Sequence, residues 1–167
     1  ELRSEVDFTK VTVQSTWFLP AAERTVVALS GRAGMGWPHG DTLEIPLHER
    51  FYLGGSNTVR GFTQDSVGPY NLDSSGDRIP TGGSSMVQFN AELRWSTTGG
   101  SGFVLFVDAG NVWVEQAINL RDLRASYGSG FRYHTPVGPL RIDYGQKIHR
   151  QPGESPGELH FSIGQAF

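Results

Sequence analysis

The stretch Ser85-Met86-Val87-Gln88-Phe89-Asn90-Ala91-Glu92-Leu93-Arg94-Trp95 decides the fold of this chain. Its odd-numbered positions are mostly apolar and its even-numbered positions are mostly polar, so the side chains alternate with a period of two. This period is typical of a β-strand with one apolar and one hydrated face. The same alternation occurs in 140–147 and 159–167, and more weakly in 6–19, 24–37, 103–113 and 123–133. The pattern predicts an all-β fold of about seven antiparallel strands and no regular helix.

The composition limits the class of protein. A length of 167 residues fits one domain, and 22 glycines with only 37% hydrophobic residues disfavour a large packed interior. The formal charge of −3 provides no basic field for nucleic acid, and the absence of Cys excludes disulfides and thiolate metal sites. The apolar runs are far shorter than the roughly 18 residues of a membrane helix. Because the chain starts at Glu1 without a leader, we expect it to be processed or a fragment.

The predicted connections alternate in length. They are short at 20–23, 96–102 and 134–138 and long at 38–83, 114–121 and 148–156, as in bacterial membrane barrels with short turns at one end and long loops at the other. Aromatic residues fall near the C-terminal ends of the strands, so they divide between both rims of an antiparallel sheet. We therefore predict a membrane girdle, with a soluble sandwich as the alternative. The predicted girdle residues are Trp17, Trp37, Trp95, Trp113 and Phe167.

Seven strands do not match the even strand number of bacterial single-chain barrels. Within lipid, an open sheet edge leaves backbone groups unpaired at a cost of several kcal/mol each, so a membrane sheet must close. We therefore expect the chain to supply part of a larger transmembrane β-barrel, with neighbouring strands that these residues do not contain. A seven- or eight-stranded soluble sandwich remains the alternative.

The long connection 38–83 contains Phe51-Tyr52-Leu53-Gly54-Gly55-Ser56-Asn57-Thr58-Val59-Arg60-Gly61-Phe62. This stretch resembles the "LGG…VRGF" signature of the sixth loop in the BamA/TamA superfamily of outer-membrane assembly β-barrels, the bacterial surface antigen family. The segments 85–95, 103–113 and 136–144 resemble its twelfth strand, its thirteenth strand and its turn into the fifteenth. The resemblance implies that residues 1–167 are the C-terminal portion of a sixteen-stranded barrel, with loop 38–83 inserted in the lumen. The signature residues of the loop are Gly54, Gly55, Val59, Gly61 and Phe62.

Two carboxylates give a physical reason for the signature arginine. Glu92 and Asp108 share the polar register of adjacent strands and should face each other directly or diagonally, at roughly 5–8 Å. A guanidinium from the long loop could bind both, since its planar fork suits carboxylates. We predict that Arg60 is a latch that pins the loop inside the barrel, and the resemblance implies the same role. The alternative is a solvated loop arginine.

Several glycines fall in the inward register, where a missing side chain makes room for a folded-in loop. We expect Gly61 to permit a tight loop tip. Ordinary glycines of weak strands are the alternative interpretation. The inward glycines are Gly34, Gly36, Gly110, Gly128, Gly130, Gly145 and Gly164.

Catalytic and metal-binding patterns find no support in the sequence. Asp73-Ser74-Ser75-Gly76-Asp77 lacks the spacing of a calcium loop, and Gly128-Ser129-Gly130 lacks the outer glycines of a nucleophile elbow. The histidines His39, His48, His134, His149 and His160 show no zincin spacing. We predict no catalytic residue, no metal and no cofactor.

The resemblance implies an integral outer-membrane protein that inserts or translocates other polypeptides. The terminal strand, about 157–167, would form a weak seam with the first strand of the barrel, through Phe161, Ile163, Gly164 and Phe167. Expected partners are outer-membrane lipid, the remaining barrel strands and POTRA domains of the same or another chain, and unfolded or nascent clients, but not nucleic acid. The alternatives are a two-partner secretion transporter, a barrel anchor of a passenger enzyme, and a soluble β-sheet binding module.

Overall fold

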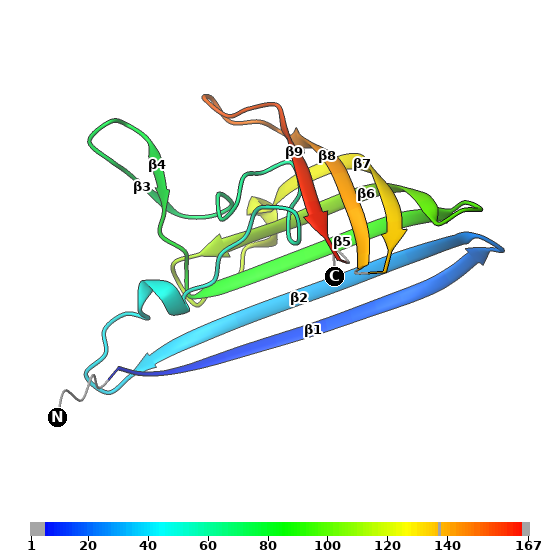
Figure 1. Ribbon diagram of the computed structural model, residues 1–167. Helices are drawn as coiled ribbons and strands as arrows, with labels where there is room; N and C mark the ends of the chain where they lie inside the picture. The colour runs from blue at the N-terminus through cyan, green and yellow to red at the C-terminus, as the bar shows by residue number, and fades with distance from the viewer. Residues whose placement is uncertain (1–5, 137, 165–167) are drawn as a thin grey trace.

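Seven strands form one antiparallel sheet in which consecutive main strands are neighbours. The computed structural model describes residues 6–136 and 138–164. The strands are β1 (Asp7–Ala22), β2 (Thr25–His39), β5 (Ser85–Ser96), β6 (Ser101–Trp113), β7 (Arg124–Thr135), β8 (Gly138–Ile148) and β9 (Gly157–Ile163). The predicted all-β fold of about seven strands is confirmed (Figure 1). Among the described residues the sheet does not close, because β1 and β9 are its two edges.

The connections keep the alternation of short and long that the sequence indicates, but one of them contains unexpected structure. Loop 38–83, predicted to lack strands, carries the hairpin of β3 (Tyr70–Leu72) and β4 (Arg78–Pro80). Strands of three residues are too short to produce a readable alternation. The acidic cluster between them is a turn, in which Asp73 Oδ1 accepts hydrogen bonds from the backbone N–H groups of Ser75 and Asp77. Two single turns of 3-10 helix complete the loops, η1 (Leu47–Glu49) and η2 (Leu120–Asp122).

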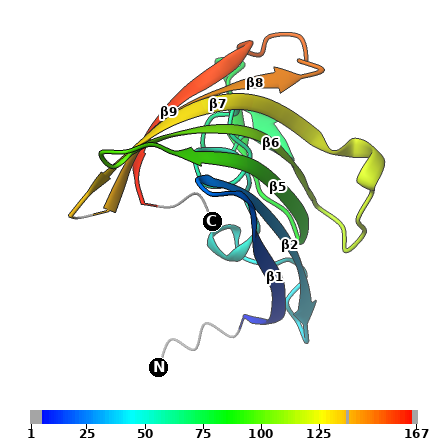
Figure 2. The same cartoon turned by 90° about the vertical axis from the view of Figure 1, so that its right-hand side faces the viewer.

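The two faces of the curved sheet differ in chemistry. Large apolar side chains such as Phe89, Leu105 and Phe161 are exposed on the outer face. Loop 38–83 lies on the concave side of the sheet, where Figure 2 shows it beneath the strands. The buried hydrophobic cluster joins that loop to β5 and β6 and consists of Phe51, Leu53, Val59, Phe62, Val67, Met86 and Val112. The core therefore lies between a loop and one sheet, which is not the arrangement of a sandwich.

Inward glycines let the loop approach the sheet. A Cβ at Gly34 would lie 2.5 Å from the Phe51 ring, and one at Gly36 would lie 2.5 Å from Ile45 Cδ1. Gly164 differs, because it follows the end of β9 with φ +108° and has open space around it. Within the described residues, no helix combines the length and the apolar character needed to cross a membrane.

Candidate functional site

The side chain of Arg60 lies at the centre of the concave face and is 1% exposed. Its Nε donates to Asp108 Oδ2 at 2.8 Å and its Nη2 donates to Asp108 Oδ1 at 2.9 Å. Its Nη1 donates to Glu92 Oε1 at 2.5 Å, and its backbone N–H donates to Asp108 Oδ2 at 3.0 Å. The structure thus brings the three predicted residues together, with a bidentate pair to one carboxylate and a single bond to the other.

The register of β5 and β6 positions the two carboxylates. Asn90 faces Asp108 and Glu92 faces Phe106, so Glu92 and Asp108 are diagonal neighbours. Asn90 Nδ2 donates to Asp108 Oδ1 at 2.8 Å and to the carbonyl oxygen of Thr58 at 2.6 Å. The Phe106 ring lies 3.6 Å from Arg60 Cζ, in a cation–π contact. The site therefore binds both the side chain and the backbone of the loop tip.

Glycines shape the loop tip that carries Arg60. Gly54, Gly55 and Gly61 have φ of +113°, +100° and +92°, a region that side chains rarely adopt. The Gly55 N–H donates to the carbonyl oxygen of Phe62 at 3.1 Å and closes the tip. Val59 and Phe62 are buried against the sheet. All five predicted signature residues therefore belong to one compact turn around the arginine.

A third carboxylate, which the sequence did not single out, extends the site. Arg132 donates through Nη1 to Asp143 Oδ1 at 2.5 Å and through Nη2 to Oδ2 at 3.1 Å, and Arg141 Nη2 donates to the same Oδ2 at 3.1 Å. Arg60 Nη1 lies 3.7 Å from Asp143 Oδ2, so the two clusters are one network. The network consists of Glu92, Asp108, Asp143, Arg60, Arg94, Arg132 and Arg141.

Sequence reasoning missed this extension because alternation places a residue on a face but does not set its cross-strand neighbours. Arg141 and Asp143 were already in the polar register of their strand. The pairing of Arg132 with Arg141 across the short turn makes Asp143 a diagonal neighbour of Arg132. Gly130, which faces Asp143, leaves the space that the carboxylate occupies.

Electrostatics favour the charged form of Arg60. Burial by itself lowers the pKa of this guanidinium, but the hydrogen bond to Asp108 and the charges of Asp108, Glu92 and Asp143 outweigh it, so the pKa is raised overall. Each of the three carboxylates already accepts a charged hydrogen bond from an arginine. Such an arrangement suits holding a loop in place.

The predicted girdle tryptophans lie towards both ends of the sheet. Trp17 and Trp95 lie towards the end with the turns after β1 and β5, and Trp37 and Trp113 towards the end with the long loops. Trp17 is five positions from the end of β1, which continues to Ala22, beyond the predicted boundary at 19. Phe167 lies outside the described residues.

The predicted seam residues lie at the free edge of the sheet. Phe161 and Ile163 belong to β9 and point outward, and both are exposed. Gly164 directly follows the strand, and its N–H donates to the carbonyl oxygen of Pro139 at 2.9 Å. Phe167, the fourth predicted seam residue, lies beyond the described part of the chain.

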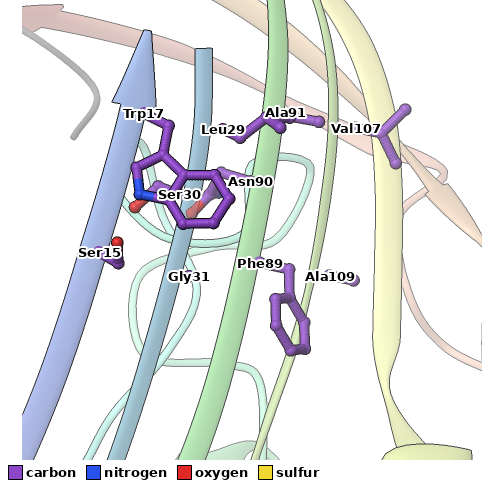
Figure 3. A pocket seen from close by; sticks show the side chains of 10 residues that line it. All are labelled: Ser15, Trp17, Leu29, Ser30, Gly31, Phe89, Asn90, Ala91, Val107 and Ala109. Atoms are coloured by element: carbon purple, nitrogen blue, oxygen red, sulfur yellow. The ribbon is translucent and has the colours of Figure 1, made fainter.

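A shallow hollow of about 440 Å³ interrupts the outer face. Figure 3 shows the ten residues that line it, among them Trp17 on β1, Phe89 on β5 and Val107 on β6. Small residues from adjacent strands, Gly31, Ala91 and Ala109, are part of its lining. Its lining is almost entirely apolar, as is the exposed surface around it. Such a surface is suited to contact with hydrocarbon.

An antiparallel sheet with an apolar outer face, a polar inner face and a loop bound to the inner face defines part of a transmembrane β-barrel. Comparison with known proteins agrees, because a model of the Omp85 superfamily domain matches residues 2–167. The chain belongs to the Omp85 superfamily. The resemblance seen in the sequence and the predicted integral outer-membrane location are both confirmed.

Individual relatives match nearly the whole chain. The chain is 27% identical to the outer membrane protein assembly factor BamA of Neisseria meningitidis serogroup B, over 98% of this chain and 24% of that protein. It is 33% identical to the outer membrane protein assembly factor BamA of Nitratidesulfovibrio vulgaris, over 96% of this chain and 21% of that protein. The chain thus spans about a quarter or less of the length of these relatives.

Solved structures agree on the fold. A crystal structure of BamA from Haemophilus ducreyi, lacking POTRA domains 1–3, matches 92% of this chain and 34% of that chain, with a TM-score of 0.75 at 22% identity. Together with the family membership, this match makes the soluble alternatives wrong. The seven-stranded sheet is a portion of an outer-membrane barrel whose closure requires strands outside this chain.

Proposed function

We propose that this chain is the C-terminal portion of a barrel that assembles other proteins into an outer membrane. The relatives matched over nearly its whole length are named for outer-membrane protein assembly. One structural observation carries the proposal, namely the edge strand β9. Its ladder with β8, from Leu140–Ile163 to Gln146–Gly157, is the shortest between neighbouring main strands in the described residues.

The mechanism that we propose is strand addition at this edge. An unpaired strand edge presents N–H and C=O groups that an extended polypeptide can pair with, which is β-augmentation. In the complete barrel, β9 would pair with the first strand of the barrel, and a client strand would compete for that pairing. Phe161 and Ile163 on the outer side of β9 would contact lipid or client side chains.

In this proposal loop 38–83 lies inside the lumen, with Arg60 as its latch. The support is the buried network that links the loop tip to the inner faces of β5, β6 and β8. The four tryptophans would form the girdle at the two interfaces of the membrane, where amphipathic rings are favoured. POTRA domains, the remaining strands, lipid and nascent clients stay predicted partners. The absence of a metal, a cofactor, nucleic acid binding and enzymatic activity stays a prediction too.

Site-specific photo-crosslinking in the full-length protein tests the proposal. A photoreactive residue at Phe161, on the edge strand, should capture a nascent outer-membrane client during its insertion. The matched control is Phe89, an equally outward phenylalanine in the middle of the sheet, which should capture only lipid. Client crosslinks at Phe89 as strong as those at Phe161 would contradict a role for the edge.

A third position separates this function from secretion through the lumen. Gln14 alternates with the outward residues of β1 and lies on the same face as Thr16, which bonds Ser30 on the inner side. A two-partner secretion transporter predicts substrate crosslinks at Gln14 and none at Phe161. A passenger anchor predicts capture of a client at neither position.

A further inference from the structure

The loop tip also contacts the edge strand of the sheet. The backbone N–H of Gly61, next to the latch arginine, donates to Nε2 of His160 at 3.2 Å. His160 lies in the middle of β9 on its inner face. A bond between residues 99 positions apart thus joins the signature turn to the strand proposed as the seam.

Strand β8 contacts the same turn through Gly145 and Arg141. A Cβ on Gly145 would lie 2.5 Å from the Gly61 nitrogen and 2.7 Å from the carbonyl carbon of Arg60, so the two backbones are in direct contact. Arg141 Nη2 donates to the carbonyl oxygen of Ser56 at 2.7 Å, and its Nη1 donates to Asn57 Oδ1 at 3.1 Å. The loop tip therefore spans the concave face from β5 and β6 to β8 and β9.

Among the main strands, the edge strand pairs only with β8 in the described residues. In that part of the chain it is the shortest of the seven main strands, with seven residues. Its outward side chains Leu159, Phe161 and Ile163 are largely exposed. The hydrogen bond from the loop tip therefore gives β9 a second support besides its ladder with β8.

We propose that His160 is a positioning residue through which loop 38–83 braces β9, so that displacement of the loop tip frees this edge. This inference rests on the proposed function in one respect, namely that the edge of β9 is the seam where a client strand binds. The brace itself is a physical link between two segments of this chain. It makes the state of the latch network and the pairing strength of the seam interdependent.

Hydrogen–deuterium exchange of the full-length protein in phospholipid vesicles tests the brace. In His160→Leu the Gly61 N–H loses its acceptor, and the β9 amides should exchange about fivefold faster, as expected for losing one net hydrogen bond. In His160→Gln the side-chain oxygen can still accept, so exchange should stay within about twofold of the unaltered protein. The matched control is Ser162→Ala, because Ser162 Oγ lies on the same strand and has no hydrogen-bond partner in the described residues.

The outcomes separate the brace from the function. Equal β9 exchange in His160→Leu, Ser162→Ala and the unaltered protein overturns the brace, and client capture at Phe161 would still show whether the assembly function stands. Faster exchange in His160→Leu with recovery in His160→Gln supports the brace. If that result comes with client crosslinks only at Gln14, the brace holds and the assembly function fails.

Discussion

At the scale of single residues, the guanidinium of Arg60 is buried away from water. Taking a charge from water costs several kcal/mol, and only close opposite charges with good hydrogen-bond geometry offset that cost. Arg60 meets both conditions through Asp108 and Glu92. Removing one of these three side chains would therefore leave the other two charged and buried.

Replacing Arg60 with Ala should lower the free energy of unfolding by about 3–5 kcal/mol, since Asp108 would stay buried without the guanidinium that it binds and Glu92 would lose one of its arginine partners. Urea unfolding of the full-length protein in vesicles measures the change. Arg121→Ala is the control, because Arg121 is exposed in a loop and should change stability by less than about 0.5 kcal/mol. Equal midpoints for the two variants would contradict the buried latch.

Asp143→Asn should be similarly costly, by about 3 kcal/mol, because Arg132 and Arg141 would lose their shared carboxylate. Arg132→Gln should be destabilising as well. The double variant should cost at least about 1 kcal/mol less than the sum of the two, since the residues belong to one network. Additive losses in the same urea titration would mean that the Arg132–Asp143 pair contributes little.

The sequence predicted Arg60, Glu92 and Asp108 because each has a local signal, a signature turn or a place in an alternating strand. It did not predict that Asp143, Arg132 and His160 join them. The alternation indicates that these three polar residues face inward, but which residues lie next to them depends on the register between strands. His160 additionally meets a turn 99 positions away, and no local pattern encodes that distance.

At the scale of elements, loop 38–83 approaches β8 closely at Gly145, where the strand lacks a side chain. Gly145→Ala should push the Arg60–Gly61 backbone off β8 and lower the free energy of unfolding by about 1–3 kcal/mol, as overpacking does. Gly31→Ala is the matched control, because its added Cβ would meet Phe89 at an ordinary 3.7 Å. If both alanines change the urea midpoint equally, the loop does not rest on Gly145.

The hairpin of β3 and β4 contacts the loop after β8 through Arg78 and Glu154. Glu154 in the loop after β8 accepts hydrogen bonds from Arg124 Nη2 at 2.6 Å and from Arg78 Nη1, on the hairpin, at 3.3 Å. Burial raises the pKa of Glu154, but the bonds from Arg124 and from the Gln151 N–H and the charges of Arg124 and Lys147 outweigh it. The pKa of this carboxyl therefore lies below its ordinary value of about 4.5.

The pKa of Glu154 is lower in the folded than in the unfolded protein. The stabilisation by its bonds to Arg78 and Arg124 is therefore fully present above the unfolded pKa and is lost as the pH falls through the folded pKa. Spin labels at the exposed positions Ile79 and Arg150 should give a narrow distance distribution at pH 7 that broadens once the pH has fallen well below the ordinary value of about 4.5. In Glu154→Gln the distribution should be broad at both pH values. A distribution in Glu154→Gln that is as narrow at pH 7 as in the unaltered protein would contradict the contact.

Strand number, strand order and the alternation of turns and loops could all be predicted, because each follows from local period and from turn residues. The short hairpin could not, since Tyr70–Leu72 and Arg78–Pro80 are too brief to show a period. Some strand ends also differ from the predicted ends. Strand β1, predicted to end at 19, reaches Ala22 by pairing with the start of β2. Boundaries of this kind are set by the partner strand.

At the scale of the whole molecule, the distribution of polarity is the reverse of that in a soluble protein. The sheet exposes aliphatic and aromatic side chains outward and buries arginines and carboxylates inward. A lipid-facing wall around a polar lumen explains both halves of this distribution. The same asymmetry predicts that one added charge has opposite consequences on the two faces.

Val107→Arg places a charge in the middle of the outer face of β6, where Val107 is 51% exposed. It should lower the free energy of unfolding in vesicles by about 2–4 kcal/mol, the cost of arginine near the bilayer midplane of a barrel. Thr12→Arg adds the same charge to β1 on the face of Thr16, towards the lumen, and should cost less than about 1 kcal/mol because water reaches it. Urea titration of folding measures both. Equal costs, or a larger cost for Thr12→Arg, would mean that the apolar face of this sheet does not contact lipid.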